Sequence, residues 1–249
     1  SQFGGVGVFT REVQHAVLDR RADIAVHSLK DLPTFKVEGL TLAAVPSRGP
    51  TGDALVSKKH RSFTELPIGA VVATSSLRRK AQLLHRRPDL KLIDIRGNVD
   101  TRLRKLVEQD LDATILAQAG LIRLGLEREI TEVLDATWMF PAVGQGALGL
   151  ECRVNDAETL AIVTQLNDAP TRAAVLAERA MLRGLGGGCQ VPIGARTSMI
   201  DGTLKLHGVV LPPDGKQRIN FEASLPPEQA ETLGELVASN LRQQGAQAL

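Results

Sequence analysis

Short apolar segments alternate with amphipathic ones in the first half of the chain, and this alternation limits the fold more than any other feature. The intervening segments carry apolar side chains at helical spacing, and the first of them places Leu77 and Ala81 on one face. Ser75 or Ser76 can cap this helix, and Asn98 can cap the next. The alternation predicts a mainly parallel, doubly wound sheet, with strands at residues 71–74, 90–95 and 113–117.

The N-terminal region continues the same pattern. Thr10 is expected to cap a helix, and residues 22–26 are expected to form a strand with Ile24 and Val26 on one side. Residues 1–9 are rich in glycine and contain no initiator Met. We interpret them as an opening loop and the chain as N-terminally incomplete.

Two connections divide the chain into units. Residues 46–52 are rich in Pro, Gly and Ser and predict a crossing into a second unit, and the apolar residues 147–150 are expected to return the chain to the first. The last third reads as a helix that stops at glycines, a hairpin and a closing helix. We expect an α/β protein of two lobes and a small C-terminal α+β domain, with boundaries at residues 1–46 plus 147–164, 52–140 and 169–249.

The composition excludes several classes of function. Thirty Lys and Arg against 28 Asp and Glu give a net charge of +2, and aromatic residues make up 3% with no Tyr, which argues against a nucleic-acid binder. No apolar run reaches the roughly 18 residues of a membrane span. With only Cys152 and Cys189, neither a disulfide framework nor a metal site is indicated. We expect a cytoplasmic protein, or a plastid protein in a eukaryote.

A local concentration of positive charge contrasts with this neutral background. Arg78 and Arg79 lie at the start of one predicted helix, and Arg96 and Arg102 flank the start of the next. Such positions favour an anion, and a guanidinium offers a planar fork that fits carboxylates and phosphates. The pattern predicts an anion cradle where the two strand-to-helix turns meet. Surface helices also carry solvated arginines, which is the interpretation we favour for Arg86, Arg87 and Arg104.

Two further side chains are candidates for chemistry. Asp31 lies beside Lys30 at a strand end, where it could stabilise a cationic intermediate or exchange a proton with an amine leaving group. A structural ion pair or a turn cap explains it equally well. Cys189 follows three glycines, which suits a covalent attachment point, although a lone cysteine is more often an inert core residue. Cys152, at the end of an apolar strand, fits that inert role.

Matching segments along nearly the whole chain resemble the porphobilinogen deaminase family, also called hydroxymethylbilane synthases, of tetrapyrrole biosynthesis. The resemblance implies two lobes like those of type II periplasmic binding proteins, with doubly wound mixed sheets, and a third domain that presents a cysteine. It also implies a transferase that joins four porphobilinogen molecules head to tail, with loss of ammonia, and releases hydroxymethylbilane by hydrolysis. The segments are residues 4–10, 27–33, 74–79, 96–102, 141–146 and 187–194.

The family carries a dipyrromethane cofactor as a thioether on a cysteine that matches Cys189. Its pyrroles bear acetate and propionate arms, so the resemblance implies that the basic residues bind a polyanion. Asp31 matches the catalytic aspartate, which stabilises the azafulvene that loss of ammonia leaves. The positions implied for the cofactor are Ser28, Lys30, Thr74, Ser75, Ser76, Arg78, Arg79, Arg96, Gly97 and Gly188, and those for the substrate are Arg96, Arg102, Arg123 and Gln145. No metal, nucleic acid or membrane is implied, and a monomer is expected.

The chain departs from the family pattern at its N-terminus. It lacks about the first strand, helix and second strand of the first lobe, which supply an arginine and a serine to the family's active site. It also has Gln2 and Val6 where relatives often carry lysines. We therefore expect a protein of only these residues to be unstable and poorly active. The alternative function is a non-catalytic anion-binding protein of the same two-lobed fold, which would need neither Asp31 nor Cys189.

Overall fold

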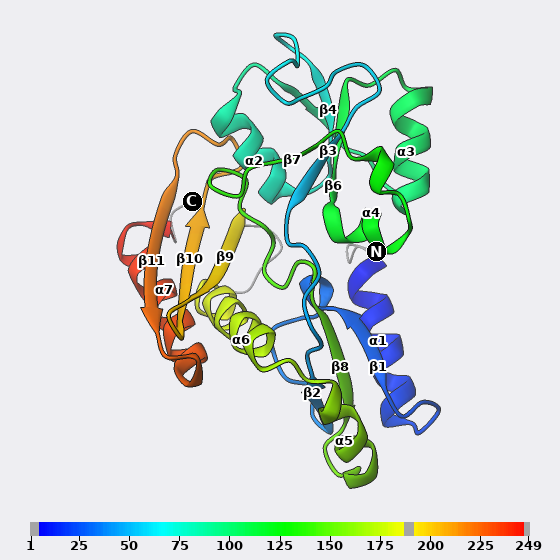
Figure 1. Ribbon diagram of the computed structural model, residues 1–249, viewed down its shortest axis with the longest axis vertical. Coiled ribbons are helices and arrows are strands. Elements are labelled where there is room, and N and C mark those ends of the chain that lie inside the picture. The colour runs from blue at the N-terminus through cyan, green and yellow to red at the C-terminus, as the bar shows by residue number, and fades with distance from the viewer. Residues whose placement is uncertain (1–4, 187–191, 247–249) are drawn as a thin grey trace.

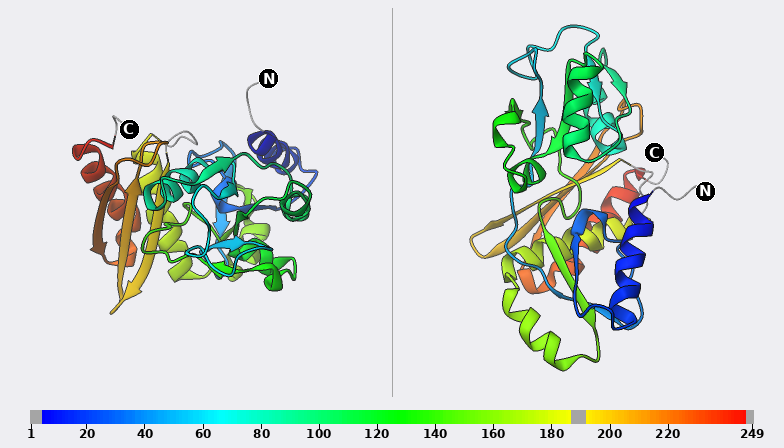
Figure 2. Two further views of the ribbon diagram at one scale, coloured as in Figure 1. Left: turned by 90° about the horizontal axis from the view of Figure 1, so that it is seen from above. Right: turned by 90° about the vertical axis from the view of Figure 1, so that its right-hand side faces the viewer.

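The computed structural model describes residues 5–186 and 192–246 and divides them among three sheets, each with its own helices (Figure 1). In Figure 1 the second lobe lies at the top, the first lobe at the lower right and the C-terminal domain at the left. Figure 2 shows the two lobes stacked along the long axis, with the C-terminal domain beside them. The expected α/β class with a separate C-terminal α+β domain is confirmed.

The first lobe is built on a three-stranded sheet. Its elements are α1 (Gly5–Leu18), β1 (Ala25–Ser28), the 3-10 helix η1 (Leu29–Asp31), β2 (Leu40–Ala44), β8 (Leu148–Arg153), α5 (Ala157–Val163) and η3 (Thr164–Leu166). The strand order is β1-β8-β2, and β8 pairs antiparallel with both neighbours. The expected return of the chain to the first lobe is therefore confirmed. β8, the returning strand, lies between β1 and β2 and runs in the opposite direction to both.

The second lobe has a five-stranded mixed sheet. Its elements are β3 (Asp53–Val56), β4 (Val71–Ala73), α2 (Leu77–Arg86), β5 (Lys91–Ile93), α3 (Val99–Glu108), β6 (Ala113–Ala117), α4 (Gln118–Arg123), η2 (Glu127–Glu129) and β7 (Glu132–Val133). The strand order is β5-β4-β6-β3-β7. β4 pairs parallel with β5 and β6, as the strand–helix alternation predicts, whereas β3 runs antiparallel to β6 and β7.

The C-terminal domain packs two helices on an antiparallel sheet in the order β11-β10-β9. Its elements are α6 (Ala169–Gly184), β9 (Ile193–Ile200), β10 (Thr203–Val210), β11 (Ile219–Leu225), η4 (Pro227–Gln229) and α7 (Ala230–Gln243). The helix, the hairpin and the closing helix follow the sequence prediction, and β9 is an additional strand. Ala81 and Phe140 of the second lobe pack on Val209 and Leu211, which joins the two parts through an apolar contact.

Two expectations for the N-terminal region are wrong. α1 begins at Gly5, so Thr10 lies inside the helix instead of capping it; tertiary packing often overrides the weak helix propensity of such a sequence. β1 spans Ala25–Ser28 instead of residues 22–26, so Ile24 lies before it, and Val26 is 61% exposed. The cause is the position of α1, because Val17 packs on Ala25 and so buries the opposite face of the strand.

The sequence predicts the N-terminal caps of α2 and α3 correctly, but it predicts the wrong buried face for α2. The Ser76 hydroxyl accepts a hydrogen bond from the Arg79 N–H at 3.4 Å, and Asn98 caps α3 in the same way. Leu77, however, is exposed, whereas Arg78 and Arg79 are buried. A buried carboxylate that accepts hydrogen bonds from both guanidiniums explains this reversal and is described below.

The chain crosses between the lobes twice, in two segments that run side by side (Figures 1 and 2). These crossing segments are residues 45–52 and 141–147. The Gly49 N–H donates to the Gly146 carbonyl at 3.1 Å. Gly146 has φ +83°, and a Cβ on it would lie 2.6 Å from the Gly49 oxygen, so this approach requires glycine.

A buried ion pair ties both crossing segments to the C-terminal domain. The Arg48 guanidinium donates to both Glu178 oxygens, at 2.7 and 3.0 Å, and its Nε donates to the Gln145 carbonyl at 2.8 Å. The Gly144 N–H and the Thr197 hydroxyl also donate to Glu178, each at 2.8 Å. Both lobes are therefore anchored on α6 and β9 by one carboxylate.

Breaking this pair should destabilise the whole molecule. In Glu178→Gln the Arg48 charge stays in a largely buried place without its counter-charge, and we expect a loss of roughly 3–5 kcal/mol in the free energy of unfolding. Urea denaturation followed by circular dichroism measures it. Arg104→Ala removes a mostly exposed pair with Glu108 and serves as the control, with an expected change of about 0.5 kcal/mol or less. Equal effects of the two variants would contradict the role given to Glu178.

The close packing of α6 on α7 depends on Gly234. A Cβ at this position would lie 2.3 Å from the Ala177 carbonyl oxygen and 2.7 Å from the Met181 nitrogen, and backbone atoms cannot move aside easily. Gly234→Ala should therefore lower stability by about 1–3 kcal/mol. Gly120→Ala is the matched control, because no described atom lies within 4 Å of its added Cβ. A thermal melt of both variants should show a lower transition for Gly234→Ala alone.

Candidate active site

The candidate site lies at the junction of the lobes, where the end of β1 approaches the start of α2. Lys30 and Asp31 belong to η1, directly after β1, and Arg78 and Arg79 belong to the first turn of α2. Desolvation lowers the pKa of Lys30, and the positive charge of Arg79 lowers it further. The charge of a guanidinium in the second lobe therefore acts on an ammonium group of the first lobe.

The guanidiniums of Arg78 and Arg79 do not project freely into solvent. Both side chains are buried and donate to Asp53 at the start of β3. Arg78 Nη1 lies 2.7 Å from Asp53 Oδ2, and Arg79 Nε and Nη2 lie 3.0 and 2.7 Å from Oδ1. Arg79 Nη1 also donates to the Ile115 carbonyl at 2.8 Å, and Arg78 Nη1 donates to the Phe140 carbonyl. The predicted cradle thus rests on an internal carboxylate.

Asp53 is fully buried and ionised. Burial by itself would raise the pKa of this carboxyl group, but the charges of Arg78 and Arg79 and their hydrogen bonds more than offset the effect, so the pKa lies well below its usual range. Burial also lowers the pKa of the Arg78 guanidinium, which Asp53 partly restores. The three side chains therefore form a charged cluster with one net positive charge.

Asp31 and Lys30 influence each other's protonation. Desolvation raises the pKa of Asp31, and the adjacent Lys30 charge opposes this shift. The pKa of Lys30 is lowered, mainly by desolvation, while Asp31 and Asp53 act in the opposite direction. Both side chains keep solvent access despite this crowding. Groups whose pKa values shift towards each other are suited to proton transfer.

The hydroxyl groups predicted for the site lie around the N-terminus of α2. The Ser75 hydroxyl donates to the Ile95 carbonyl at 2.8 Å and links the ends of β4 and β5. Thr74 is buried and accepts from the Ser76 N–H at 3.3 Å. Ser28 is exposed at the end of β1. The structure thus brings Thr74, Ser75 and Ser76 to one turn, where they shape the backbone.

Three more predicted arginines come from other turns of the second lobe. Arg102 is half-buried, and its Nε donates to the carbonyl of Gly97 at 2.8 Å, where φ is +123°. Burial and then the charge of Arg79 lower the pKa of Arg102. Arg96, which precedes Gly97 in the chain, is exposed. Arg123 lies farther along, with Nη2 donating to the Gly146 carbonyl of a crossing segment at 2.7 Å.

Gln145 was expected to bind substrate, and the structure places it inside the protein. Its side chain is almost fully buried, and Nε2 donates to the Thr51 carbonyl at 2.6 Å and to Asp53 Oδ1 at 2.9 Å. The amide therefore links one crossing segment to the other and to the cluster of Asp53 with Arg78 and Arg79. Gly188 and Cys189 lie outside the described residues; α6 ends before them at Gly184 and β9 begins after them at Ile193.

Sequence reasoning missed Asp53, Arg48 and Glu178. Asp53 follows the Pro- and Gly-rich crossing segment and begins a strand in which every residue is buried. A lone carboxylate at the start of such an apolar segment is a signal that a buried cation faces it, because an unpaired charge is costly inside a protein. Glu178 sits within the apolar face of α6 and gives the same signal.

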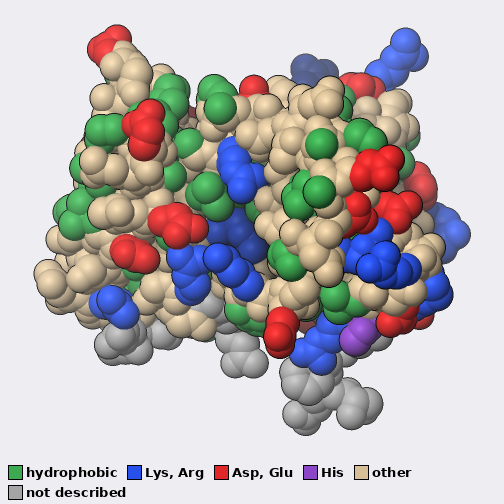
Figure 3. Space-filling view, turned by 90° about the horizontal axis from the view of Figure 1, so that it is seen from below, with side chains coloured by type: hydrophobic (Ala, Val, Ile, Leu, Met, Phe, Trp, Pro, Cys, Tyr) green, Lys and Arg blue, Asp and Glu red, His purple; other side chains and the backbone are tan. Residues whose placement is uncertain are grey.

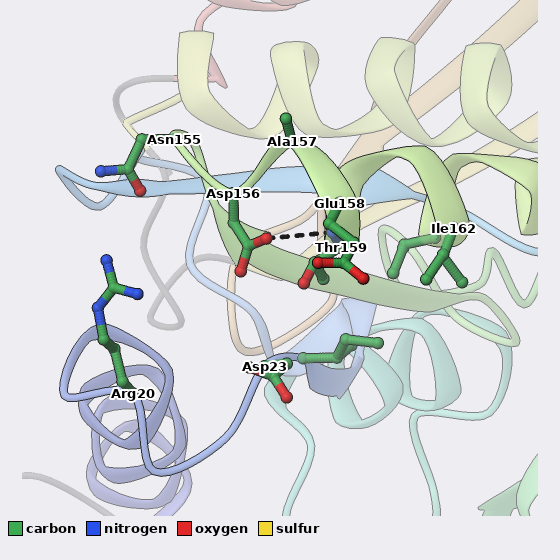
Figure 4. Close-up of a pocket in the computed structure, with 10 residues that line it drawn as sticks. Arg20, Asp23, Asn155, Asp156, Ala157, Glu158, Thr159 and Ile162 are labelled. Carbon is green, nitrogen blue, oxygen red and sulfur yellow. Dashed lines mark hydrogen bonds between the residues drawn. The ribbon is translucent and has the colours of Figure 1, made fainter.

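Charge is unevenly distributed over the surface. On the face seen from below, Lys and Arg side chains gather along a central hollow, and Asp and Glu side chains lie towards the sides (Figure 3). A cavity of about 670 Å³ lies elsewhere, between the end of α1 and the start of α5 (Figure 4). Arg20, Asp23 and Asp156 line it, with Asp156 accepting from the Thr159 N–H at 3.1 Å. None of the predicted site residues lines this cavity.

Cations outnumber carboxylates at the junction of the lobes. The charge of Arg79 acts on both Lys30 and Arg102, and Asp31 and Asp53 are the carboxylates that oppose it at Lys30. This donor set fits a ligand with several carboxylates, such as a dipyrromethane with acetate and propionate arms. Within residues 5–186 and 192–246, no group of three or more His, Cys, Asp or Glu side chains is arranged to hold a metal. The helices of this part are too short or too polar to span a membrane.

Solved structures of low sequence identity overlay part of the chain. The methionine-binding protein MetQ is 16% identical, with 66% of this chain and 78% of that chain covered and a TM-score of 0.43. An ABC transporter periplasmic substrate-binding protein from Coxiella burnetii is 16% identical, with 66% and 79% covered and a TM-score of 0.41. Overlaps at this level carry no information about function.

The chain is much more similar to the members of one sequence family than to these solved structures. Residues 1–161 match the dipyrromethane cofactor-binding domain of porphobilinogen deaminase, and residues 172–243 match its C-terminal domain. The porphobilinogen deaminase of Desulforudis audaxviator is 50% identical over 99% of this chain and 80% of its own length. Those of Syntrophotalea carbinolica and Chromobacterium violaceum are each 49% identical, over 99% and 100% of this chain and 78% and 81% of their own lengths. The chain belongs to the porphobilinogen deaminase family.

Proposed function

We propose that this chain joins four porphobilinogen molecules head to tail, with loss of one ammonia from each, and releases hydroxymethylbilane by hydrolysis. It is a deaminating transferase of tetrapyrrole biosynthesis, and a dipyrromethane bound to the protein supplies the pyrrole carbon to which the first substrate is joined. The observation that supports this most directly is the cluster of Arg78 and Arg79 on Asp53, which lies within electrostatic range of Lys30, the neighbour of Asp31 in η1. The non-catalytic alternative is not favoured.

The basic residues bind the carboxylates of the pyrrole chain. Guanidiniums suit this task because each offers a planar fork to an acetate or propionate arm and stays charged at any working pH. The cofactor contacts are assigned to Ser28, Lys30, Thr74, Ser75, Ser76, Arg78, Arg79, Arg96, Gly97 and Gly188, with Cys189 as the thioether attachment. The substrate contacts are assigned to Arg96, Arg102, Arg123 and Gln145, where Gln145 acts through the groups that it holds.

Asp31 is the proposed catalytic residue. When ammonia leaves porphobilinogen, positive charge develops on the pyrrole, and the Asp31 carboxylate stabilises that charge at close range. Lys30 favours the ionised form of Asp31, because its charge opposes the rise in pKa that desolvation causes. Since an amine leaving group must depart protonated and a pyrrole proton must be lost after bond formation, a carboxylate with a raised pKa is suited to exchanging protons with both.

The proposed active unit is the monomer, in which both lobes of the same chain contribute residues to the site. We assign the protein to the cytoplasm, where a reducing environment keeps the thiol of Cys189 available for attachment. We also assign three domains with boundaries at residues 1–46 plus 147–164, 52–140 and 169–249. The three separate sheets support this division.

Two variants separate cofactor attachment from catalysis. The intact mass of the purified protein should exceed the chain mass by one dipyrromethane, and Cys189→Ser should lack this increment. Asp31→Asn should keep the increment, because the carboxylate is not the attachment point, while kcat for porphobilinogen consumption falls by about 100-fold or more. An increment that persists in Cys189→Ser would contradict the attachment site, and full activity of Asp31→Asn would contradict the catalytic assignment.

The pH dependence of kcat tests the coupling between Lys30 and Asp31. A raised pKa leaves a smaller ionised fraction of Asp31 at a given acidic pH, so activity should fall at higher pH than for an unperturbed aspartate. Lys30→Met removes the charge that opposes this shift, so the acid limb should move further towards neutral pH. Lys36→Met, on the exposed part of the following loop, is the control and should leave the limb in place. An unmoved limb in Lys30→Met would refute the coupling.

A further inference from the structure

The Asp53 carboxylate accepts hydrogen bonds from three side chains, and no role in the reaction has so far been assigned to it. Arg78 donates to Oδ2, and both Arg79 and Gln145 donate to Oδ1, over distances of 2.7 to 3.0 Å. Asp53 itself is 0% exposed and cannot touch a ligand in solution. Its partners come from α2 and from the crossing segment of residues 141–147, so it links the arginine-bearing helix to the junction of the lobes.

Each of the two guanidiniums is held at two points. Arg79 binds Asp53 through Nε and Nη2 and the Ile115 carbonyl through Nη1. Arg78 binds Asp53 and the Phe140 carbonyl. Because a guanidinium is planar, two anchors fix the direction of its remaining N–H groups. These two side chains are only 8% and 7% exposed, so little of each is available to a ligand and its orientation matters.

Asp53 also sets the charge at this point. Two guanidiniums and one carboxylate leave one net positive charge, close to the further charges of Lys30 and Arg102. Without the carboxylate, Arg78 and Arg79 would repel each other inside the protein, and one of them would turn away from its neighbour. Orientation and charge of the pair therefore depend on the same residue.

We propose that Asp53 is a positioning residue of this enzyme: it aims the guanidiniums of Arg78 and Arg79 at the carboxylates of the bound pyrrole chain and cancels one of their two charges. Asp53 acts only through these arginines and takes no part in bond making. The inference rests on the proposed function, in which Arg78 and Arg79 bind those carboxylates.

The test compares Asp53→Asn with the wild type. The amide keeps the shape of the side chain but presents N–H groups to one of the arginines. Because the substrate is joined to the pyrrole chain that Arg78 and Arg79 hold, we expect KM for porphobilinogen to rise by about tenfold, the effect of losing an oriented charged hydrogen bond, while kcat changes much less. Intact mass should also show a smaller fraction of chains carrying dipyrromethane. The Arg79 Nε–H resonance, protected by Asp53 in the wild type, should exchange rapidly in the variant.

Asp112→Asn is the matched control. Asp112 is another carboxylate of the second lobe, and it accepts from the Val71 N–H at 2.7 Å and interacts with His60, but it contacts neither arginine. Its loss should lower the melting temperature and leave KM and cofactor content unchanged. If the control raises KM as much as Asp53→Asn does, or if Asp53→Asn folds and keeps the wild-type KM, the proposal is overturned.

A double variant keeps the test decisive if Asp53→Asn does not fold. Asp53→Asn with Arg79→Gln restores the net charge of the cluster to one, so it should fold. Its KM should lie well under tenfold above that of Arg79→Gln alone, because only Arg78 is then left for Asp53 to position. Additive effects on KM would overturn the positioning role. Arg79→Gln by itself tests the underlying assignment. If both its KM and its cofactor content are unchanged, the binding role of Arg79 is refuted, whereas a change there with normal values in Asp53→Asn refutes only the role of Asp53.

Discussion

The ion pair between Arg48 and Glu178 joins the three parts of the molecule at one place. Arg48 belongs to the first crossing segment, its Nε holds the Gln145 carbonyl of the second, and Glu178 belongs to α6. A buried pair is tolerated only when further hydrogen bonds satisfy it, and Gly144 and Thr197 supply these. The relative placement of both lobes and the C-terminal domain therefore follows from completing the hydrogen bonds of one carboxylate.

The candidate active site shows how a protein can stabilise an excess of positive charge in its interior. An isolated guanidinium inside a fold is costly, yet Arg78 and Arg79 are both buried because Asp53 compensates them. Lys30 and Asp31 come from the other lobe, and desolvation disfavours the charged form of both side chains. A polyanionic ligand satisfies the cations that the protein leaves without carboxylate partners, which is the electrostatic basis for the proposed binding role.

Local features of the fold follow from the sequence, and the long-range pairs do not. Ser76 and Asn98 mark helix starts because a cap concerns residues only three positions apart. The exposure of Val26 and the burial of Arg78 depend on which elements pack against them, and periodicity contains no such information. Arg48 and Glu178 are 130 positions apart, and Asp53 and Arg78 are 25 apart. The arginine cluster was therefore recognised as a group, while the carboxylates that orient it were not.

The backbone contact between Gly49 and Gly146 has a mechanical consequence. Both connections between the lobes pass through this point, and no side chain separates them. A rotation of one lobe against the other must then have its axis close to these two glycines. Groups near the axis, such as Arg48 and Gln145, keep their spacing while the outer rims of the lobes travel furthest.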